Sequence, residues 1–351
     1  MGLTPAFWQG RRVLVTGHTG FKGSWLSLWL QALGARVSGY ALAPDSTPAL
    51  FDDAKVAVGM SSALGDLRNL PALNAAVDAA APDVVFHLAA QPLVRASYAD
   101  PVGTWATNVM GPVHLLEALR RRGGRPIVVV VTSDKCYENR EWLWPYREDE
   151  ALGGHDPYSS SKAATEIAVA SLRRAYPDAF RLATARAGNV IGGGDWAADR
   201  LIPDLMRAFS SGVSAAIRNP GAIRPWQHVL DPLCGYLLLA EALESDATSH
   251  AEAWNFGPAE NDLHNVGDIV ERAQALWGSQ PQWHSTGGDR PHEAGILRLD
   301  SSKARGRLGW QPRWNTHEAL RATVDWYRRH QRGEDMAAFT RRQIEQYAAP
   351  N

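Results

Sequence analysis

Apolar and polar residues follow two different periods along the first half of the chain. Short apolar runs such as "RRVLVTG" and "PIVVVVTSDK" have few polar interruptions, which is typical of strands that are buried on both faces. Between such runs, stretches such as "SWLSLWLQAL" carry apolar residues three or four positions apart, which is typical of helices that cover a sheet. The two patterns therefore predict strands and helices that follow one another along the chain.

The alternation continues to about residue 192 and predicts an α/β fold. Because strands that alternate with helices pair in parallel, we expect a Rossmann-type doubly wound parallel sheet. The predicted elements are strands at 11–17, 35–42, 83–90, 127–131 and 180–192, and helices at 24–33, 70–82, 100–123 and 156–176.

The second half of the chain has a different pattern, which predicts a smaller lobe. From residue 187 onward, Gly, Pro, Asp and Arg interrupt the apolar runs, as in "GGGDWAADRLIPD" and "NPGAIRPWQHVLD". We therefore expect residues 1–186 to form the sheet domain and residues 187–351 to form mainly a loop-rich C-terminal lobe. A helix near 227–245 is expected to return to the first domain.

The composition is that of an ordinary globular protein of 351 residues. Its net charge of −1 gives no field that would hold nucleic acid or an anionic membrane, so an anionic ligand must meet local cationic clusters. We find no signal-peptide pattern and no run of about 18 apolar residues. Cys136 and Cys234 form no metal-binding pair, and His18 and His155 lack acidic or cysteine partners at ligand spacing. We therefore expect a cytoplasmic protein without a metal.

The first motif with chemical meaning is "TGHTGFKG", which follows the first strand and opens the first helix. Gly17, Gly20 and Gly23 let the backbone turn tightly and approach a pyrophosphate, whose charge then faces the helix N-terminus. The alternative is a glycine-rich connection without a ligand, which the strand–loop–helix context disfavours. No carboxylate stands at the expected end of the second strand, since Asp45 comes a few residues late. This pattern leaves the choice between NAD and NADP open.

Two further motifs add candidate residues. In "GDLRN", Asp66 and Leu67 are suited to an adenine edge, although a plain turn explains the segment equally well. In "YSSSK", Tyr158 and Lys162 lie one turn apart on one face of a predicted helix. An ammonium group beside a phenol favours the phenolate, so we expect Lys162 to lower the pKa of Tyr158 toward the working range. This spacing alone is common on protein surfaces, but with the glycine motif it indicates a dehydrogenase-type site.

The strand at 127–131 ends in hydrophilic residues, which is unusual for a strand buried on both faces. Thr132, Ser133, Asp134 and Lys135 follow it directly. One explanation is a solvated strand end with an incidental Asp–Lys ion pair, which would contribute little to stability. The tyrosine motif and the cofactor loop in the same domain favour another explanation, that these residues supply hydroxyl, acid and base groups to a reaction.

Together these motifs resemble the extended short-chain dehydrogenase/reductases that act on nucleotide sugars, and the resemblance covers essentially the whole chain. It includes "HLAAQP", "TNVMGPVHLLEA", "RAGNVIGGGDWAADRLIPD" and "RNPGAIRPWQHVLDPLCGY". Family members that dehydrate dTDP-glucose carry Thr-Asp-Glu at the strand end, whereas Ser133-Asp134-Lys135 resembles those that act on CDP-glucose. The resemblance implies NAD as the cofactor, CDP-glucose as the substrate, and a homodimer or a higher homo-oligomer.

The resemblance also implies a role for each candidate residue. The catalytic residues that it implies are Thr132, Ser133, Asp134, Lys135, Tyr158 and Lys162. The cofactor-binding residues are Gly17, Thr19, Gly20, Phe21, Lys22, Gly23, Asp66, Leu67, Leu88, Ala89, Ala90, Asn108, Tyr158 and Lys162. The substrate-binding residues, in the nucleotide-sugar-binding lobe, are Asn189, Arg200, Leu201, Arg218, Arg224, Arg290 and His292. The planar fork of an arginine can bind two phosphate oxygens at once.

In the reaction that the resemblance implies, CDP-glucose loses water and becomes CDP-4-keto-6-deoxyglucose, with a hydride moved internally from C4′ to C6′. Tyr158 takes the O4′ proton, and Lys162 holds the nicotinamide ribose. A hydroxyl of Thr132 or Ser133 hydrogen-bonds near O4′ and O6′. Protonated Asp134 donates to the departing C6′ hydroxyl, and Lys135 takes the C5′ proton. The alternative for Lys135 is to stabilise the enolate, with Tyr158 or water as the base.

Other functions stay open from the sequence. A nucleotide-sugar 4-epimerase, or a 4,6-dehydratase for a dTDP-, UDP- or GDP-sugar, shares the same fold and cofactor motifs. A non-catalytic nucleotide sensor would be expected to have lost Tyr158 or Lys162, and the chain has both. The preference for cytosine rests on the resemblance alone. The predicted helices at 100–123 and 156–176 resemble the pair that forms the family's dimer interface, although they could simply cover the sheet.

Overall fold

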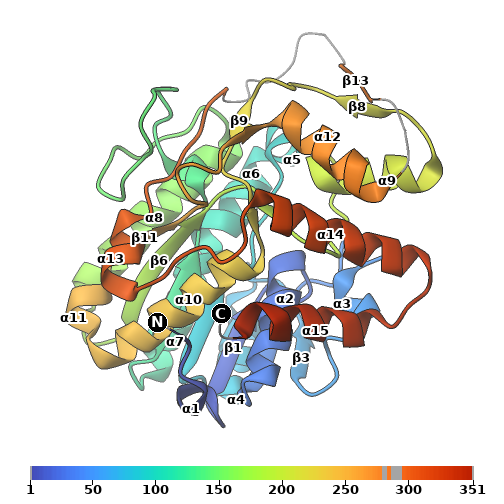
Figure 1. The fold of residues 1–351 in the computed structure, drawn as a ribbon. Coiled ribbons are helices and arrows are strands. Elements are labelled where there is room, and N and C mark those ends of the chain that lie inside the picture. The colour runs from blue at the N-terminus through green and yellow to red at the C-terminus, as the bar shows by residue number, and fades with distance from the viewer. Residues whose placement is uncertain (1, 279–282, 286–294, 350–351) are drawn as a thin grey trace.

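The computed structural model describes residues 2–278, 283–285 and 295–349, and a seven-stranded parallel sheet lies at its centre (Figure 1). The strand order is β11-β6-β5-β4-β1-β2-β3, so the order reverses at β1 and β4. This is the doubly wound sheet that the sequence predicts. The strands are β1 (Arg12–Thr16), β2 (Arg36–Ala41), β3 (Ser61–Leu64), β4 (Val84–His87), β5 (Ile127–Val131), β6 (Arg181–Ala187) and β11 (Ala253–Phe256).

Buried side chains alternate between two hydrophobic clusters, one on each face of the sheet. In β5, Ile127, Val129 and Val131 belong to one cluster, while Val128 and Val130 belong to the other. Helices cover both faces, which explains why β5 is an unbroken apolar run. On the first face, α2 (Phe21–Ala32) and α10 (Leu230–Ser245) pack on the strands, while α15 (Met336–Ala348) packs on α2 and α14 (Thr316–Gln331) packs on α15. The helices on the second face are α4 (Leu70–Ala80), α7 (Gly111–Arg122) and α8 (Pro157–Ala175).

A smaller group of elements follows β6, and α9, α12, β8 and β13 lie together at the top of the view (Figure 1). Short strands pair within this group as β7–β10, β8–β13 and β9–β12. Between β10 and β12 the chain returns to the central sheet, because α10 packs on it and β11 pairs with β6. The elements of this group are β7 (Val190–Ile191), α9 (Leu201–Ser211), β8 (Ala215–Ile217), β9 (Ile223–Arg224), β10 (Gln227–His228), β12 (His264–Asn265), α12 (Val266–Trp277) and β13 (Trp283–Ser285).

The structure departs from the predicted elements in three places. Neither β3 nor β11 is predicted, because each has four residues and no long apolar run. The predicted strand at 180–192 ends at Ala187, and β7 begins at Val190. The predicted helix at 100–123 is interrupted by η1 (Ala106–Met110), a π-helical turn between α6 (Pro101–Trp105) and α7. A wider turn of this kind leaves little trace in the apolar spacing of the sequence.

The remaining helices are short and connect the larger elements. They are α1 (Pro5–Trp8), α3 (Leu50–Asp53), α5 (Val94–Ala99), η2 (Asp134–Cys136), α11 (Ala247–His250) and α13 (Ser302–Leu308). Among the described residues, none of the helices has both the length and the apolarity needed to cross a membrane.

Candidate active site

A cavity of about 740 Å³ lies where the central sheet meets the smaller group of elements. Its lining includes the loops after β1, β4 and β5, which leave the carboxyl ends of the strands around the point where the strand order reverses. Open α/β sheets bind their ligands at such a point. The predicted site residues that line this cavity are Gly17, Thr19, Gly20, Phe21, Lys22, Gly23, Asp66, Leu67, Leu88, Ala89, Ala90, Thr132, Ser133, Asp134, Lys135, Tyr158, Lys162, Asn189, Arg200, Leu201, Arg218 and Arg224.

The other three predicted site residues are Arg290, His292 and Asn108. Arg290 and His292 lie outside the described residues. Asn108 is buried with 1% of its surface exposed and does not line the cavity. Its side chain accepts a hydrogen bond from the backbone N–H of Gln91 and donates to the Gln91 carbonyl and to Ser161 Oγ. The π-helical turn therefore directs Asn108 toward the loop after β4, where it supports the cavity wall without facing the cavity.

The glycine-rich loop has the geometry of a pyrophosphate site. Gly17 has a φ of +78°, and a Cβ there would lie 2.6 Å from the backbone nitrogen of Ala89. A Cβ on Gly23 would lie 2.0 Å from the carbonyl oxygen of Gly17. Since α2 begins at Phe21, the unpaired N–H groups of its first turn are available to an anion. The loop therefore fits the diphosphate of a dinucleotide, which needs close access to the backbone.

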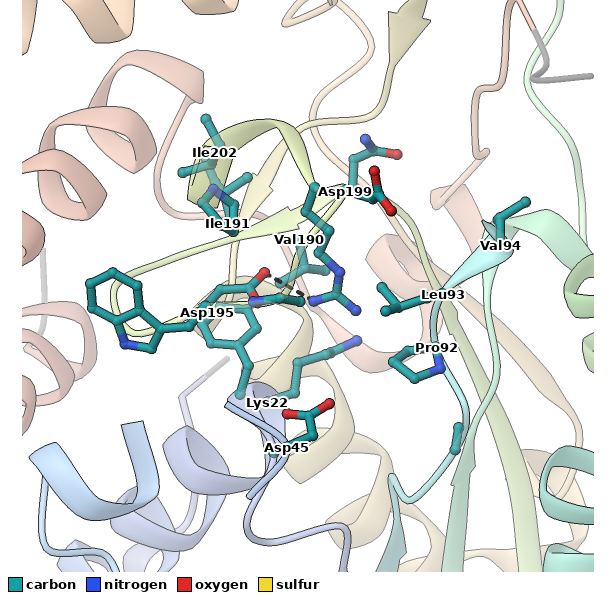
Figure 2. Close-up of a pocket in the computed structure, with 18 of the residues that line it drawn as sticks. Lys22, Asp45, Pro92, Leu93, Val94, Val190, Ile191, Asp195, Asp199 and Ile202 are labelled. Carbon is teal, nitrogen blue, oxygen red and sulfur yellow. Dashed lines mark hydrogen bonds and ion pairs between the residues drawn. The ribbon is translucent and has the colours of Figure 1, made fainter. Parts of the chain in front are cut away.

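Lys22 and Asp45 bring opposite charges to the same part of the cavity (Figure 2). Lys22 Nζ donates a hydrogen bond of 3.1 Å to Tyr236 Oη. Burial, together with the positive charges of Lys162 and Arg200, lowers the pKa of Lys22 to about 7. The carboxylate of Asp45 is close enough to favour the charged form of Arg200. Although Asp45 comes late after the second strand, it is part of the cavity wall.

The end of β5 presents a hydroxyl and a carboxyl group to the cavity. Ser133 Oγ donates to Asp134 Oδ1 over 3.0 Å and accepts the backbone N–H of Lys135 over 3.2 Å. Asp134 has 3% of its surface exposed, and its Oδ2 receives no hydrogen bond from the described residues. Burial raises the pKa of Asp134 above its usual range, against the opposing effect of Lys135. A Cβ on Gly188 would lie 2.1 Å from this Oδ2, so a glycine is required beside the carboxyl group.

Helix α8 carries Tyr158 and Lys162 into the same cavity, as the sequence predicts. The expected electrostatic effect is wrong for the protein without cofactor, because burial raises the pKa of Tyr158 to about 12. A hydrogen bond with Ser133 opposes this increase and is the main influence that lowers the pKa. Burial also lowers the pKa of Lys162 to about 8. Lys162 Nζ lies 3.5 Å from the carbonyl oxygen of Val131, which places it beneath the end of β5.

Three arginines that line the cavity are paired with two residues of the segment between β7 and α9. Arg200 Nη1 donates to Asp195 Oδ2 over 2.9 Å, an ion pair drawn in the close-up (Figure 2). Asp199 Oδ1 accepts a hydrogen bond of 3.0 Å from Arg95 Nη1, and its carbonyl oxygen accepts one of 2.6 Å from Arg218. The cavity is therefore rich in cationic groups suited to phosphate oxygens.

Sequence reasoning missed Arg95, Asp195 and Asp199 as parts of this site. "GGGDWAADR" has the two carboxylates close to Arg200, so this charge clustering was the available signal. Arg95 had no such signal, because its partner is more than 100 residues away. Within residues 2–278, 283–285 and 295–349, no group of three or more His, Cys, Asp or Glu side chains is arranged to hold a metal ion.

Comparisons with known proteins agree with this geometry. The family described as GDP-mannose 4,6 dehydratase matches residues 14–323. A CDP-glucose 4,6-dehydratase of Salmonella typhimurium is 50% identical over 348 residues, which cover 97% of each chain.

Two solved structures have the same fold. DesIV, a dTDP-glucose 4,6-dehydratase of Streptomyces venezuelae with NAD and TYD bound, superimposes with a TM-score of 0.80 at 22% identity, covering 93% of this chain and 99% of that one. MoeE5, in complex with UDP-glucuronic acid and NAD, gives a TM-score of 0.78 at 26% identity, covering 91% and 99%.

Proposed function

The chain belongs to the GDP-mannose 4,6 dehydratase family, and from this premise we propose that it is a CDP-glucose 4,6-dehydratase. It converts CDP-glucose to CDP-4-keto-6-deoxyglucose and water, without net oxidation or reduction. The observation that carries this proposal is the 50% identity, over 97% of both chains, with a protein of that name. Ser133, Asp134 and Lys135 at the cavity support it, because an elimination needs acid and base groups there.

NAD fits the glycine-rich loop, and the chain's residues from Gly17 to Gly23 would hold its diphosphate beside the start of α2. Asp66 and Leu67 also line the cavity, and we propose that they contact the adenine of NAD. MoeE5, at 26% identity, has NAD bound, which supports the same cofactor here. NAD held there would supply a reversible hydride acceptor for the transfer from C4′ to C6′ of the sugar.

The residues of the chain move the protons. Tyr158 takes the O4′ proton, assisted by Ser133 and by the positive charge of Lys162. Burial raises the pKa of Tyr158 to about 12, so positive charge beside the phenol would favour the phenolate that this transfer needs. Once C4′ is a ketone, the C5′ proton becomes acidic. Asp134, whose protonated form is favoured by burial, gives its proton to the departing C6′ hydroxyl.

Lys135 is the remaining candidate for the C5′ proton. It lies at the cavity between Asp134 and the buried Cys136. A neutral lysine would act as the base, whereas a charged one would stabilise the enolate while Tyr158 or water removes the proton. Two variants separate these roles. Lys135→Arg keeps the charge but cannot act as a base, whereas Lys135→Met removes both the charge and the base.

The substrate diphosphate is proposed to bind among Arg200, Arg218 and Arg224, with Asn189 and Leu201 beside the sugar. Each of these arginines lines the cavity. A diphosphate that enters competes with Asp195 for Arg200. Arg290 and His292, proposed for the same region, lie outside the described residues.

We also propose that the protein is a homodimer and cytoplasmic. Val102, Trp105 and Met110 on α6 and η1, and Ile167 on α8, have 42–78% of their surface exposed. These helices contact one another, so the residues belong to neighbouring parts of one surface. The two cysteines form no disulfide, which is typical of a reducing compartment. Sedimentation equilibrium should give a dimer that Ile167→Lys dissociates, whereas Val58→Lys, at an equally exposed site, leaves it intact.

The test of the function is a nucleotide panel. The purified protein is incubated with NAD and, separately, with CDP-, dTDP-, UDP- and GDP-glucose, and the products are identified by NMR. A 4-keto-6-deoxy sugar from CDP-glucose alone is the expected result. Turnover of another nucleotide sugar would overturn the base preference, and an epimerised sugar would overturn the elimination chemistry.

A further inference from the structure

A buried hydrogen-bond network lies directly behind the end of β5, and Thr132 is its one member with a role assigned above. Its centre is Glu166, one helical turn beyond Lys162 in α8. Glu166 Oε2 pairs with Arg186 Nη2 of β6 over 2.9 Å, and each side chain has 3% of its surface exposed. The carboxylate also accepts hydrogen bonds from two threonine hydroxyls, Thr132 on Oε1 and Thr184 on Oε2. The carboxylate therefore has protein donors on both of its oxygens.

Arg186, the partner of Glu166, contacts Tyr137, which ends the segment 132–137 that begins at Thr132. Arg186 Nη1 donates to Tyr137 Oη over 2.8 Å, and its guanidinium lies 5.0 Å from the centre of that ring. Tyr137 Oη in turn donates to Asn255 Oδ1 over 2.7 Å. The pair therefore holds both ends of the segment 132–137. Glu166 binds Thr132 at its start, and Arg186 binds Tyr137 at its end. Ser133, Asp134 and Lys135 lie between these two attachment points.

The pair is charged in spite of its burial. Burial alone would raise the pKa of Glu166, but Arg186 and the hydroxyls of Thr132 and Thr184 bring it below the usual range. A buried ion pair is often no more stabilising than apolar residues of the same size. Such a pair is better explained by the positions in which it holds the residues around it. Here it holds the segment that contains Ser133, Asp134 and Lys135.

We propose that the Glu166–Arg186 pair positions the segment 132–137, so that Ser133 and Asp134 meet Tyr158 across the cavity. The proposal rests on the function proposed above, since it assigns these residues to the elimination. Glu166 and Tyr158 are on the same helix, so the pair fixes the end of β5 relative to the helix that carries the tyrosine. A displacement of about 1 Å between reacting groups can reduce a rate about 100-fold. Thr132 is then a positioning residue, because its hydroxyl donates to Glu166.

The two threonines provide a matched experiment. Thr132→Val and Thr184→Val each remove one hydroxyl from Glu166 without changing the side-chain shape, but only Thr132 belongs to the catalytic segment. Thr132→Ser keeps the hydroxyl and is the rescue variant. The measurements are kcat and KM with CDP-glucose, the melting temperature, and hydrogen exchange of peptides that contain residues 132–137 in the protein without substrate.

Thr132→Val is expected to lower kcat about 10-fold or more with little change in KM, and to speed exchange of the segment 132–137. Thr132→Ser should restore both values toward wild type. Thr184→Val should lower the melting temperature by a similar amount while kcat stays within about two-fold. Tyr137→Phe, at the other attachment point, should behave like Thr132→Val.

Two results would overturn the proposal. If Thr132→Val slows the reaction but leaves exchange unchanged, its hydroxyl acts directly on the substrate. If both threonine variants lower the melting temperature and neither lowers kcat, the pair has only a structural role. A wild-type protein that does not convert CDP-glucose would overturn the proposed function instead, and the exchange comparison would still decide whether the pair positions the segment.

Discussion

Asp134→Asn tests the elimination step directly, because it removes one proton and almost nothing else. The carboxyl group is buried, and burial raises its pKa, which favours the protonated form that a general acid needs. Asparagine has the same shape and carries no charge. Its carbonyl oxygen can accept the hydrogen bond of Ser133, which spans 3.0 Å in the wild type. We therefore expect a change in stability of about 1 kcal/mol or less.

The expected loss of activity is far larger. A positioned general acid contributes about 10²- to 10⁴-fold to a rate, which corresponds to about 3–5 kcal/mol of transition-state stabilisation. Since Asp134 is not among the residues proposed to bind the diphosphate, KM should change little. The assay is the appearance of the C6′ methyl signal of the product by NMR, from which kcat and KM are obtained. Asp83→Asn is the control, because Asp83 pairs with Arg12 away from the cavity and should keep kcat within about two-fold.

A second substrate identifies the proton as the reason for the loss. In CDP-6-deoxy-6-fluoroglucose the leaving group is fluoride, which departs as an anion and needs less help from an acid. The ratio of wild-type to Asp134→Asn rates should therefore shrink strongly with this substrate. An equal ratio for both substrates would refute the assignment of Asp134 as the acid, as would a kcat for Asp134→Asn close to that of the wild type.

Three further predictions concern the cofactor loop and two buried titratable groups. Gly23→Ala should abolish NAD binding in calorimetry, because its Cβ would lie 2.0 Å from a backbone oxygen. Gly306→Ala is the control, since its Cβ meets open space within α13. This variant should bind NAD normally and be stabilised by about 0.5–1 kcal/mol. Burial lowers the pKa of Lys162 to about 8, so kcat/KM should fall as the pH rises through about 8, and a flat profile from pH 7 to 10 would contradict a role for its charge. Burial raises the pKa of Asp231 to about 7 from an ordinary value of 3.8, so its contribution to stability is complete below about pH 4 and is lost as the pH rises through 7. Relative to Asp231→Asn, the wild type should lose up to about 4 kcal/mol of unfolding free energy between pH 4 and pH 8 in urea titrations, and a constant difference would contradict this sign.

Much of the fold follows from local patterns in the sequence. The unbroken apolar run of β5 predicts burial on both faces, and both hydrophobic clusters contain its side chains. The cofactor loop could be predicted for the same reason, since Gly17 and Gly23 are needed for contacts within a few residues of themselves or with the neighbouring strand end. In contrast, β3 and β11 are short edge strands, and their pairing depends on the position of the whole sheet.

The sequence by itself determined which groups are available for chemistry: a glycine-rich turn, a tyrosine and a lysine one helical turn apart, and an acid at the end of a strand. Tertiary structure alone decided the pKa values of these groups and the directions in which their side chains point. It buries Tyr158 and Asp134, which raises both pKa values, and it turns Asn108 away from the cavity. It also joins Thr132 and Arg186 through Glu166. Burial and hydrogen bonding depend on residues that are distant in the chain, and a linear pattern carries no record of which of them become neighbours.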